Sequence, residues 1–312
     1  SGNVFIAGES LSTNWVAGGY QTNKSGTTSY NDAFLAKLAP DGSHLWSTFI
    51  GGTLAETGNG VAALTSGAAI VVGQSASSGW IAGGYNTNWT STRAYAAVIS
   101  PQGTPVWSTF MGPASADANA VAVNPSGAIY VAGYCSGNST NWVANGADNT
   151  RNGGSSDAFL VRLGDNGAHH WSAFYGGALI DQGLAVASAT NGVVYLAGYT
   201  TSTNLWMLGN PDATANGGED AFVVRMLDRY QPRGPITIQQ IVKLPGDELQ
   251  LLTSASGWAV EALNVEGTES LTGNPTWSTE STAVFQATGA GLWDIRLPLP
   301  ATNRFFRIHG SQ

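Results

Sequence analysis

Charge is scarce in this chain, helix-forming residues are few, and long apolar runs are absent. Only 10% of the 312 residues are charged, and a net charge of −8 leaves no basic face for a nucleic-acid partner. The single cysteine, Cys135, excludes an intrachain disulfide, and its place at the end of an apolar run predicts an inert thiol. No apolar run approaches the roughly 20 residues of a transmembrane helix, so we expect no transmembrane segment.

Glycine and tryptophan are abundant instead, with 41 and 11 copies. Together with many Thr, Ser, Asn and Val residues they are typical of short strands joined by turns. The composition therefore predicts an all-β protein.

Four strand-like motifs recur along residues 1–230. An apolar strand ends in Gly8, Gly73, Gly133 and Gly198, at intervals of 65, 60 and 65 residues. Each is followed by a second strand of the "DAFLAKL" type, a third strand of the "LWSTF" type and a fourth of the "GVAAL" type, although the last copy stops after its second strand. The repeats cover about residues 1–67, 68–127, 128–192 and 193–230.

The spacing separates a constant part of the repeat from a variable one. The start of the second strand and the tryptophan of the third are always 14 residues apart (Asp32 to Trp46, Arg93 to Trp107, Asp157 to Trp171). The distance from the anchor glycine to the second strand varies, and this segment holds the phrases "STNWVAGGYQTN", "SSGWIAGGYNTN", "STNWVANGADNT" and "STNLWMLGNPDA". Four short strands with one long loop per repeat predict the blades of a β-propeller, with all long loops on one face.

The succession of motifs resembles the bacterial SBBP-type repeat, which is named for a β-propeller. The resemblance covers roughly residues 1 to 230, because "VFIAG", "DAFLAKLAPDG", "LWSTFIGG" and "GNGVAAL" recur in order. The second repeat departs from it, with Arg93 in place of the aspartate and "MGPASADAN" in place of the double-glycine phrase. The resemblance implies a secreted or cell-surface bacterial protein and no agreed catalytic residues.

The last repeat lacks a third and a fourth strand. We expect residues upstream of Ser1 to supply this pair and close the ring, with the runs "ITIQQIVKL" and "ELQLLTS" as the alternative. After the proline- and glycine-containing "LDRYQPRGP", residues 231–312 read as short alternating strands. They predict a small β-sandwich of the Ig or fibronectin type.

The loop tryptophans are the candidate ligand-binding residues. They could form flat platforms for sugar rings, with asparagine side chains as hydrogen-bonding partners, or each could pack over its blade and fix the long loop. The candidates are Trp15, Trp80, Trp142, Trp206, Asn14 and Asn141.

Carboxylates supply a rival, catalytic interpretation. A glycan-active enzyme could use a pair of loop carboxylates near the propeller axis; the candidates are Glu9, Asp148, Asp157, Asp212, Glu219 and Asp220. Asp148 and Asp212 open D-x-T-x-N-G-G segments, which predict Asx turns, with calcium as the alternative. No other metal or cofactor motif is present.

The sequence favours a non-catalytic binding or scaffold protein, extracellular or at the cell surface, whose loop face meets a glycan, the cell envelope or another protein. The alternatives are the glycan-active enzyme and a structural subunit of a larger extracellular assembly.

Overall fold

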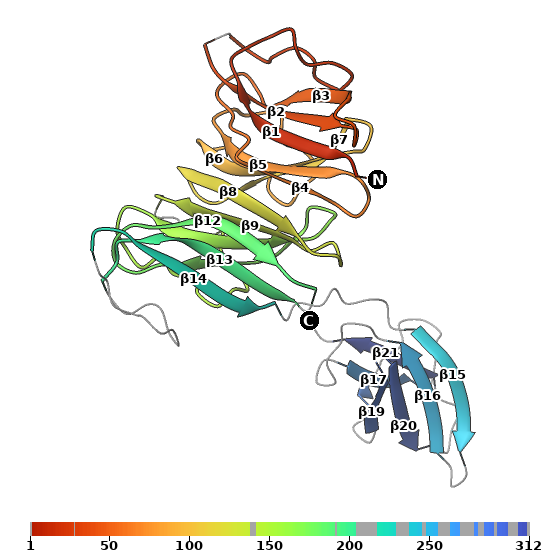
Figure 1. Ribbon diagram of the computed structural model, residues 1–312. Coiled ribbons are helices and arrows are strands. Elements are labelled where there is room, and N and C mark those ends of the chain that lie inside the picture. The colour runs from red at the N-terminus through yellow and green to blue at the C-terminus, as the bar shows by residue number, and fades with distance from the viewer. Residues whose placement is uncertain are drawn as a thin grey trace. The chain divides into compact units, whose positions relative to one another are not determined.

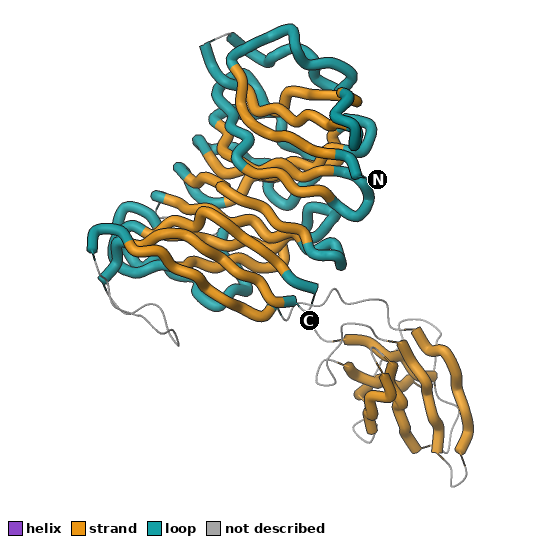
Figure 2. The backbone as a smooth tube through the Cα atoms, in the orientation of Figure 1, coloured by secondary structure: helices purple, strands orange, loops and turns teal. Residues whose placement is uncertain are grey.

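The computed structural model describes residues 2–27, 29–137, 142–190, 192–203 and 217–228, and beyond them the strands between residues 237 and 310. These residues form antiparallel sheets and contain no helix (Figure 2), which confirms the all-β prediction. Accordingly, this part of the chain has no helix of the length and apolarity that crossing a membrane requires. The chain divides into two compact units, Ser1–Asp228 and Arg229–Gln312.

The described strands of the first unit form four sheets (Figure 1). The first sheet contains β1 (Val4–Ser10), β2 (Asp32–Leu38) and β3 (His44–Ile50). The second contains β4 (Gly60–Ala63), β5 (Ala69–Ser75), β6 (Arg93–Ile99) and β7 (Pro105–Met111). The third contains β8 (Ala116–Val123), β9 (Ile129–Cys135), β10 (Asp157–Leu163) and β11 (His169–Tyr175). The fourth contains β12 (Asp181–Ser188), β13 (Val193–Thr200) and β14 (Asp220–Leu227).

The sheets are offset by one strand from the sequence repeats. The "GVAA" strand β4, which closes the first repeat, pairs with β5 and so opens the second sheet. β8 and β12 likewise open the third and fourth sheets. Each segment from β3 to β4, β7 to β8 and β11 to β12 therefore crosses from one sheet to the next. Among the described residues, the first sheet has no such opening strand and the fourth has no tryptophan-bearing strand.

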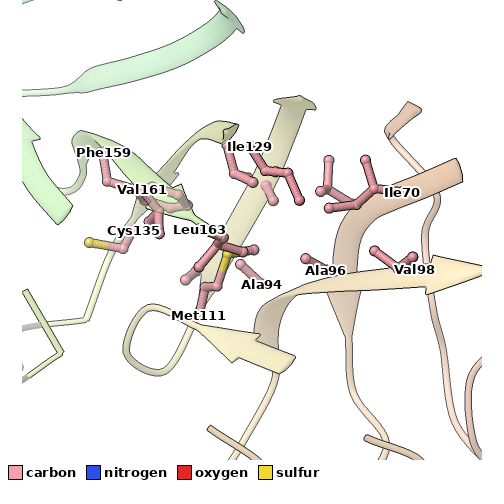
Figure 3. Packing of buried hydrophobic residues seen from close by; sticks show 14 of the residues in the cluster. Ile70, Ala94, Ala96, Val98, Met111, Ile129, Cys135, Phe159, Val161 and Leu163 are labelled. Atoms are coloured by element: carbon pink, nitrogen blue, oxygen red, sulfur yellow. The ribbon is translucent and has the colours of Figure 1, made fainter. Parts of the chain in front are cut away.

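Apolar side chains fill the space between neighbouring sheets. Between the second and third sheets, Ile70 and Ala96 on one side meet Ile129 and Val161 on the other (Figure 3). Two similar clusters join the first sheet to the second and the third to the fourth. Each buried Val, Leu, Ile or Phe side chain contributes about 1.5–3 kcal/mol relative to exposure. The sheets are thus held face to face mainly by apolar burial.

Tryptophans of the third-strand motif add one hydrogen bond to each of these interfaces. The indole nitrogen of Trp46 donates to Pro101 O (2.9 Å), that of Trp107 to Asp165 O (2.7 Å), and that of Trp171 to Asp228 Oδ1 (3.1 Å). Each acceptor residue follows the second-strand motif of the next sheet. The three tryptophans are buried.

The described strands of the second unit form two antiparallel sheets. One has the order β15-β16-β20-β19 and the other β18-β17-β21. Their strands are β15 (Thr237–Leu244), β16 (Glu248–Ser254), β17 (Leu263–Thr268), β18 (Ser278–Thr279), β19 (Val284–Gly289), β20 (Leu292–Pro298) and β21 (Phe305–Gly310). Because β15 pairs with β16, and β16 with β20, the alternative that "ITIQQIVKL" and "ELQLLTS" complete the last repeat is wrong.

Candidate functional site

The long connections of the first unit leave the ends of β1, β5, β9 and β13, as residues 11–31, 76–92, 136–156 and 201–219. In three of these connections, one tryptophan packs edge-on against an aromatic residue of the second-strand motif. Trp15 lies 4.8 Å from Phe34, and Trp80 lies 5.0 Å from Tyr95, between ring centroids. Trp142 contacts Phe159 in the same way, at 5.4 Å.

Exposure differs among the candidate binding residues. Trp80 and Trp142 are half-buried, whereas Trp15 and Asn14 are exposed. Asn14 also takes a left-handed backbone conformation, with φ of 68°. Trp206 and Asn141 lie outside the described residues.

The residues after each tryptophan hold the connection against the third-strand motif. Ala17 N donates to Ser47 Oγ (3.0 Å), and Ser47 N donates back to Ala17 O (2.7 Å). The same pair of bonds joins Ala82 to Ser108, and Ala144 to Ser172. The phrase recurs because it covers the free edge of β3, β7 and β11.

Steric limits explain the glycine that follows. A Cβ atom on Gly19 would lie 2.5 Å from Ser47 O, and one on Gly146 would lie 2.0 Å from Ser172 O. The preceding residue has positive φ in all three copies, which Asn145 tolerates as Gly18 and Gly83 do. This part of the sequence serves the loop backbone.

Charged candidates in the loops are held by local partners. Asp157 is fully buried; its Oδ2 accepts from Asn152 N (2.8 Å), and its Oδ1 lies 3.7 Å from Arg151 Nε. Asp32 accepts from Ser25 N (2.9 Å) and lies 3.9 Å from Lys24 Nζ. Through these bonds the two aspartates cap turn amides.

In the second repeat, both members of the cation–aspartate pair are replaced. Counted along the phrase, Trp89 stands where the other copies have Lys24 and Arg151, and Arg93 stands where they have aspartate. Arg93 bonds locally, with Thr90 Oγ1 at 2.5 Å from its Nη2. Trp89 is therefore free of the ion-pairing role and is exposed. Sequence reasoning missed it because it lies outside the repeated phrase.

Asp148 forms the predicted Asx turn. Its Oδ1 accepts from Thr150 N (2.8 Å) and from Thr150 Oγ1 (2.7 Å). Asp212 is outside the described residues. Within the residues that the structure describes, no group of three His, Cys, Asp or Glu side chains is arranged to hold a metal ion.

The double-glycine phrases of the first and third repeats are bound by carboxylates, Glu56 and Asp181, that the second repeat lacks. Glu56 Oε2 accepts from Gly52 N (3.0 Å), and Asp181 Oδ2 accepts from Gly177 N (2.8 Å). Glu56 Oε1 also accepts from Ser75 Oγ, whereas in the third sheet this network is replaced by the apolar Ala116 and Cys135.

Cys135 is fully buried. Burial raises its pKa to about 12, so no thiolate is populated at neutral pH. Cys135 is the equivalent of Ser75 in the previous repeat, whose hydroxyl oxygen accepts a hydrogen bond from the Trp80 indole nitrogen (3.0 Å). The buried indole nitrogen of Trp142 accordingly has no hydrogen-bond acceptor among the described residues.

A polar cluster that sequence reasoning missed lies where the opening strands begin. Asn59 Nδ2 donates to Asp117 Oδ1 (2.9 Å) and to Ala118 O (3.0 Å), from one sheet to the next. Burial raises the pKa of Asp117 to about 6, and the nearby Glu9 carboxylate adds to the increase. Asp117 could therefore be protonated or ionised near neutral pH, as a general acid or base requires. Its neighbours come from three different sheets, so no local sequence signal marks it.

The remaining carboxylate candidates differ in their exposure. Glu9 and Glu219 are exposed, and Asp220 is half-buried at the start of β14. The structure thus brings Glu9 to Asp117, and it brings Asp148 near Asp157.

Comparison with protein-family models and with curated proteins finds no match. Among solved structures, a chimera of apocarotenoid oxygenase (ACO) and RPE65 has 12% identity and a TM-score of 0.28, with coverage of 90% of this chain and 57% of that one. A mutant of Synechocystis apocarotenoid oxygenase has 13% identity and a TM-score of 0.28, with coverage of 89% and 56%. The chain spans just over half the length of each, and such low scores carry no argument about its fold or function.

Proposed function

We propose that this chain is a non-catalytic β-propeller-type protein that binds or scaffolds through its long connections. The observation that carries the proposal is that the recurring loop residues fix the loop backbone to the sheets. They hydrogen-bond to the strand edges and leave the differing side chains, such as Trp89, exposed on a fixed frame. A rigid frame with variable exposed residues suits recognition.

The propeller assignment is part of this proposal. Its support is the repeated face-to-face packing of four sheets. The strands that open the sheets also contact one another: β4 contacts β8, and β8 contacts β12. The two sheets of the second unit suit an Ig- or fibronectin-type sandwich. The resemblance of the repeats to the SBBP type supports a bacterial protein that acts outside the cell or at its surface.

A glycan is the ligand that we favour. Trp89 offers an exposed indole, and exposed aromatic rings can stack on sugar rings. The acidic, lysine-poor composition is compatible with an uncharged ligand and disfavours nucleic acid.

Asp117 supports a second candidate, the glycan-active enzyme. A carboxyl group with a pKa near 6 beside the second carboxylate of Glu9 has the chemistry of an acid and base pair. Asp117 would then donate the proton to the leaving oxygen.

A glycan array and a hydrolysis screen on the same polysaccharides distinguish the two functions. We expect binding without turnover, with affinity reduced about tenfold or more in Trp89→Ala and unchanged in Asp117→Asn. Trp142→Ala serves as the structural control, because its loss of packing should lower the melting temperature. Turnover that Asp117→Asn abolishes, or full glycan binding by Trp89→Ala, would contradict the proposal.

A further inference from the structure

Both outer faces of the four-sheet stack expose apolar side chains. The C-terminal end face is the side of the fourth sheet turned away from the third, with Tyr195, Val223, Arg225 and Leu227 exposed. The N-terminal end face is the side of the first sheet turned away from the second, with Val4 and Ile6 exposed beside Trp15. Figure 1 shows these two sheets at opposite ends of the first unit.

Three residues of the C-terminal end face, Tyr195, Val223 and Arg225, have equivalents in the third sheet that are buried. Counted from the anchor glycines, Tyr195 corresponds to Tyr130, and the exposed fractions of the two residues are 41% and 1%. Counted from the second-strand aspartates, Val223 corresponds to Leu160, with exposed fractions of 66% and 0%. Tyr130 and Leu160 pack against the fourth sheet. The C-terminal end face therefore has the composition of a sheet-binding face.

The N-terminal end face likewise has buried equivalents, on the side of the second sheet that packs against the first sheet. Ile6 corresponds to Val71, with exposed fractions of 44% and 0%. Val71 packs against the first sheet, together with the partly buried Trp80, the counterpart of Trp15. At each of the three interfaces inside the chain, the side of one sheet equivalent to the C-terminal end face packs on the side of the next sheet equivalent to the N-terminal end face.

We propose that a second copy of this chain occupies these faces, with the C-terminal end face of one copy on the N-terminal end face of the next. The two faces are complementary because their equivalents already pack together three times within the chain. Face packing of this kind needs no strand pairing between the copies.

Charge supports this occupant. Inside the chain, Lys37 Nζ donates to Pro101 O (3.0 Å), and Arg162 Nε pairs with Asp228 Oδ2 (2.7 Å). Arg225 is the exposed equivalent of these two cations. The position equivalent to Pro101 and Asp228 in the first sheet is Pro40, so Arg225 of one copy faces the Pro40 carbonyl of the next.

Such an interface joins two different faces, so it is heterologous and adds copies until a ring closes. The test uses the full chain with one face blocked at a time, by Val223→Arg or Ile6→Arg. Both positions are exposed, so both variants should fold with the melting temperature of the wild type. By analytical ultracentrifugation over a range of concentrations, the wild type should self-associate, and each variant alone should associate at least about tenfold more weakly.

Mixing the two variants is the decisive measurement. Each supplies the face that the other lacks, so a 1:1 mixture should form a heterodimer with the affinity of the wild type. Val106→Arg, at an exposed position of β7 in neither end face, is the matched control and should associate like the wild type. A wild type that stays monomeric, a mixture that does not associate, or equal weakening by Val106→Arg would overturn the proposal.

Discussion

Asp157 links a single residue to the pH dependence of stability. Burial raises its pKa to about 6, against the lowering effects of the Asn152 amide and Arg151. Its pKa in the unfolded chain is about 3.9, so between about pH 4 and pH 6 the folded state binds the proton more tightly. Its contribution to the free energy of unfolding therefore falls as pH rises through that window. Asp157→Asn cannot ionise, so the advantage of the wild type over the variant should be largest near pH 4 and shrink toward pH 7 in urea unfolding.

Asp41 provides a control of opposite sign. It is exposed, and hydrogen bonds from Ser43 lower its pKa. The stability that it contributes is present above about pH 4 and is lost only on further acidification. The difference between wild type and Asp41→Asn should be flat from pH 5 to pH 7. A difference for Asp157→Asn that is constant from pH 4 to pH 7 would show that Asp157 keeps an ordinary pKa.

At the scale of the element, each sheet edge depends on the connection laid against it. A Cβ atom on Gly84 would lie 2.6 Å from Ser108 O and 2.5 Å from Thr109 Cβ. Gly84→Ala should therefore push residues 76–92 off β7 and lower the free energy of unfolding by at least about 2 kcal/mol. Chemical denaturation measures the loss, and faster proteolytic cleavage within these residues would locate it.

Gly218 supplies the matched glycine. It also lies in a long connection, but a Cβ atom there would meet no atom within 4 Å. Gly218→Ala should leave the midpoint of denaturation within about 0.5 kcal/mol of the wild type. Equal effects of the two substitutions would mean that the contact with β7 does not hold the connection.

At the scale of the whole molecule, two units with separate sheets should unfold in separate calorimetric transitions. Trp107→Phe removes the hydrogen bond to Asp165 O between the second and third sheets. We expect it to destabilise the first unit by about 2 kcal/mol and to lower only one of the two transitions. Trp89→Phe, at an exposed site, should move neither. A shift of both transitions by Trp107→Phe would show that the units unfold together.

Local patterns in the sequence predicted most of the strands. Asp32–Leu38 and Asp157–Leu163 form strands as the recurring "DAF" motifs indicate, and tight turns follow them. In the second unit, the runs "ITIQQIVKL" and "ELQLLTS" contain the strands β15 and β16. Alternation and turn chemistry are short-range properties, so a sequence carries them directly.

The sequence by itself determined the all-β class, the repeat and the Asx turn at Asp148. Only the tertiary structure decided that β4 pairs with the second sheet, because the choice depends on packing between strands distant in sequence. It also decided that Trp15 is exposed while Trp80 is half-buried in a similar phrase, since a sheet precedes Trp80 and none of the described sheets precedes Trp15. Asp117 acquires its raised pKa in the same way, because burial and the charge of Glu9 exist only once the sheets are stacked.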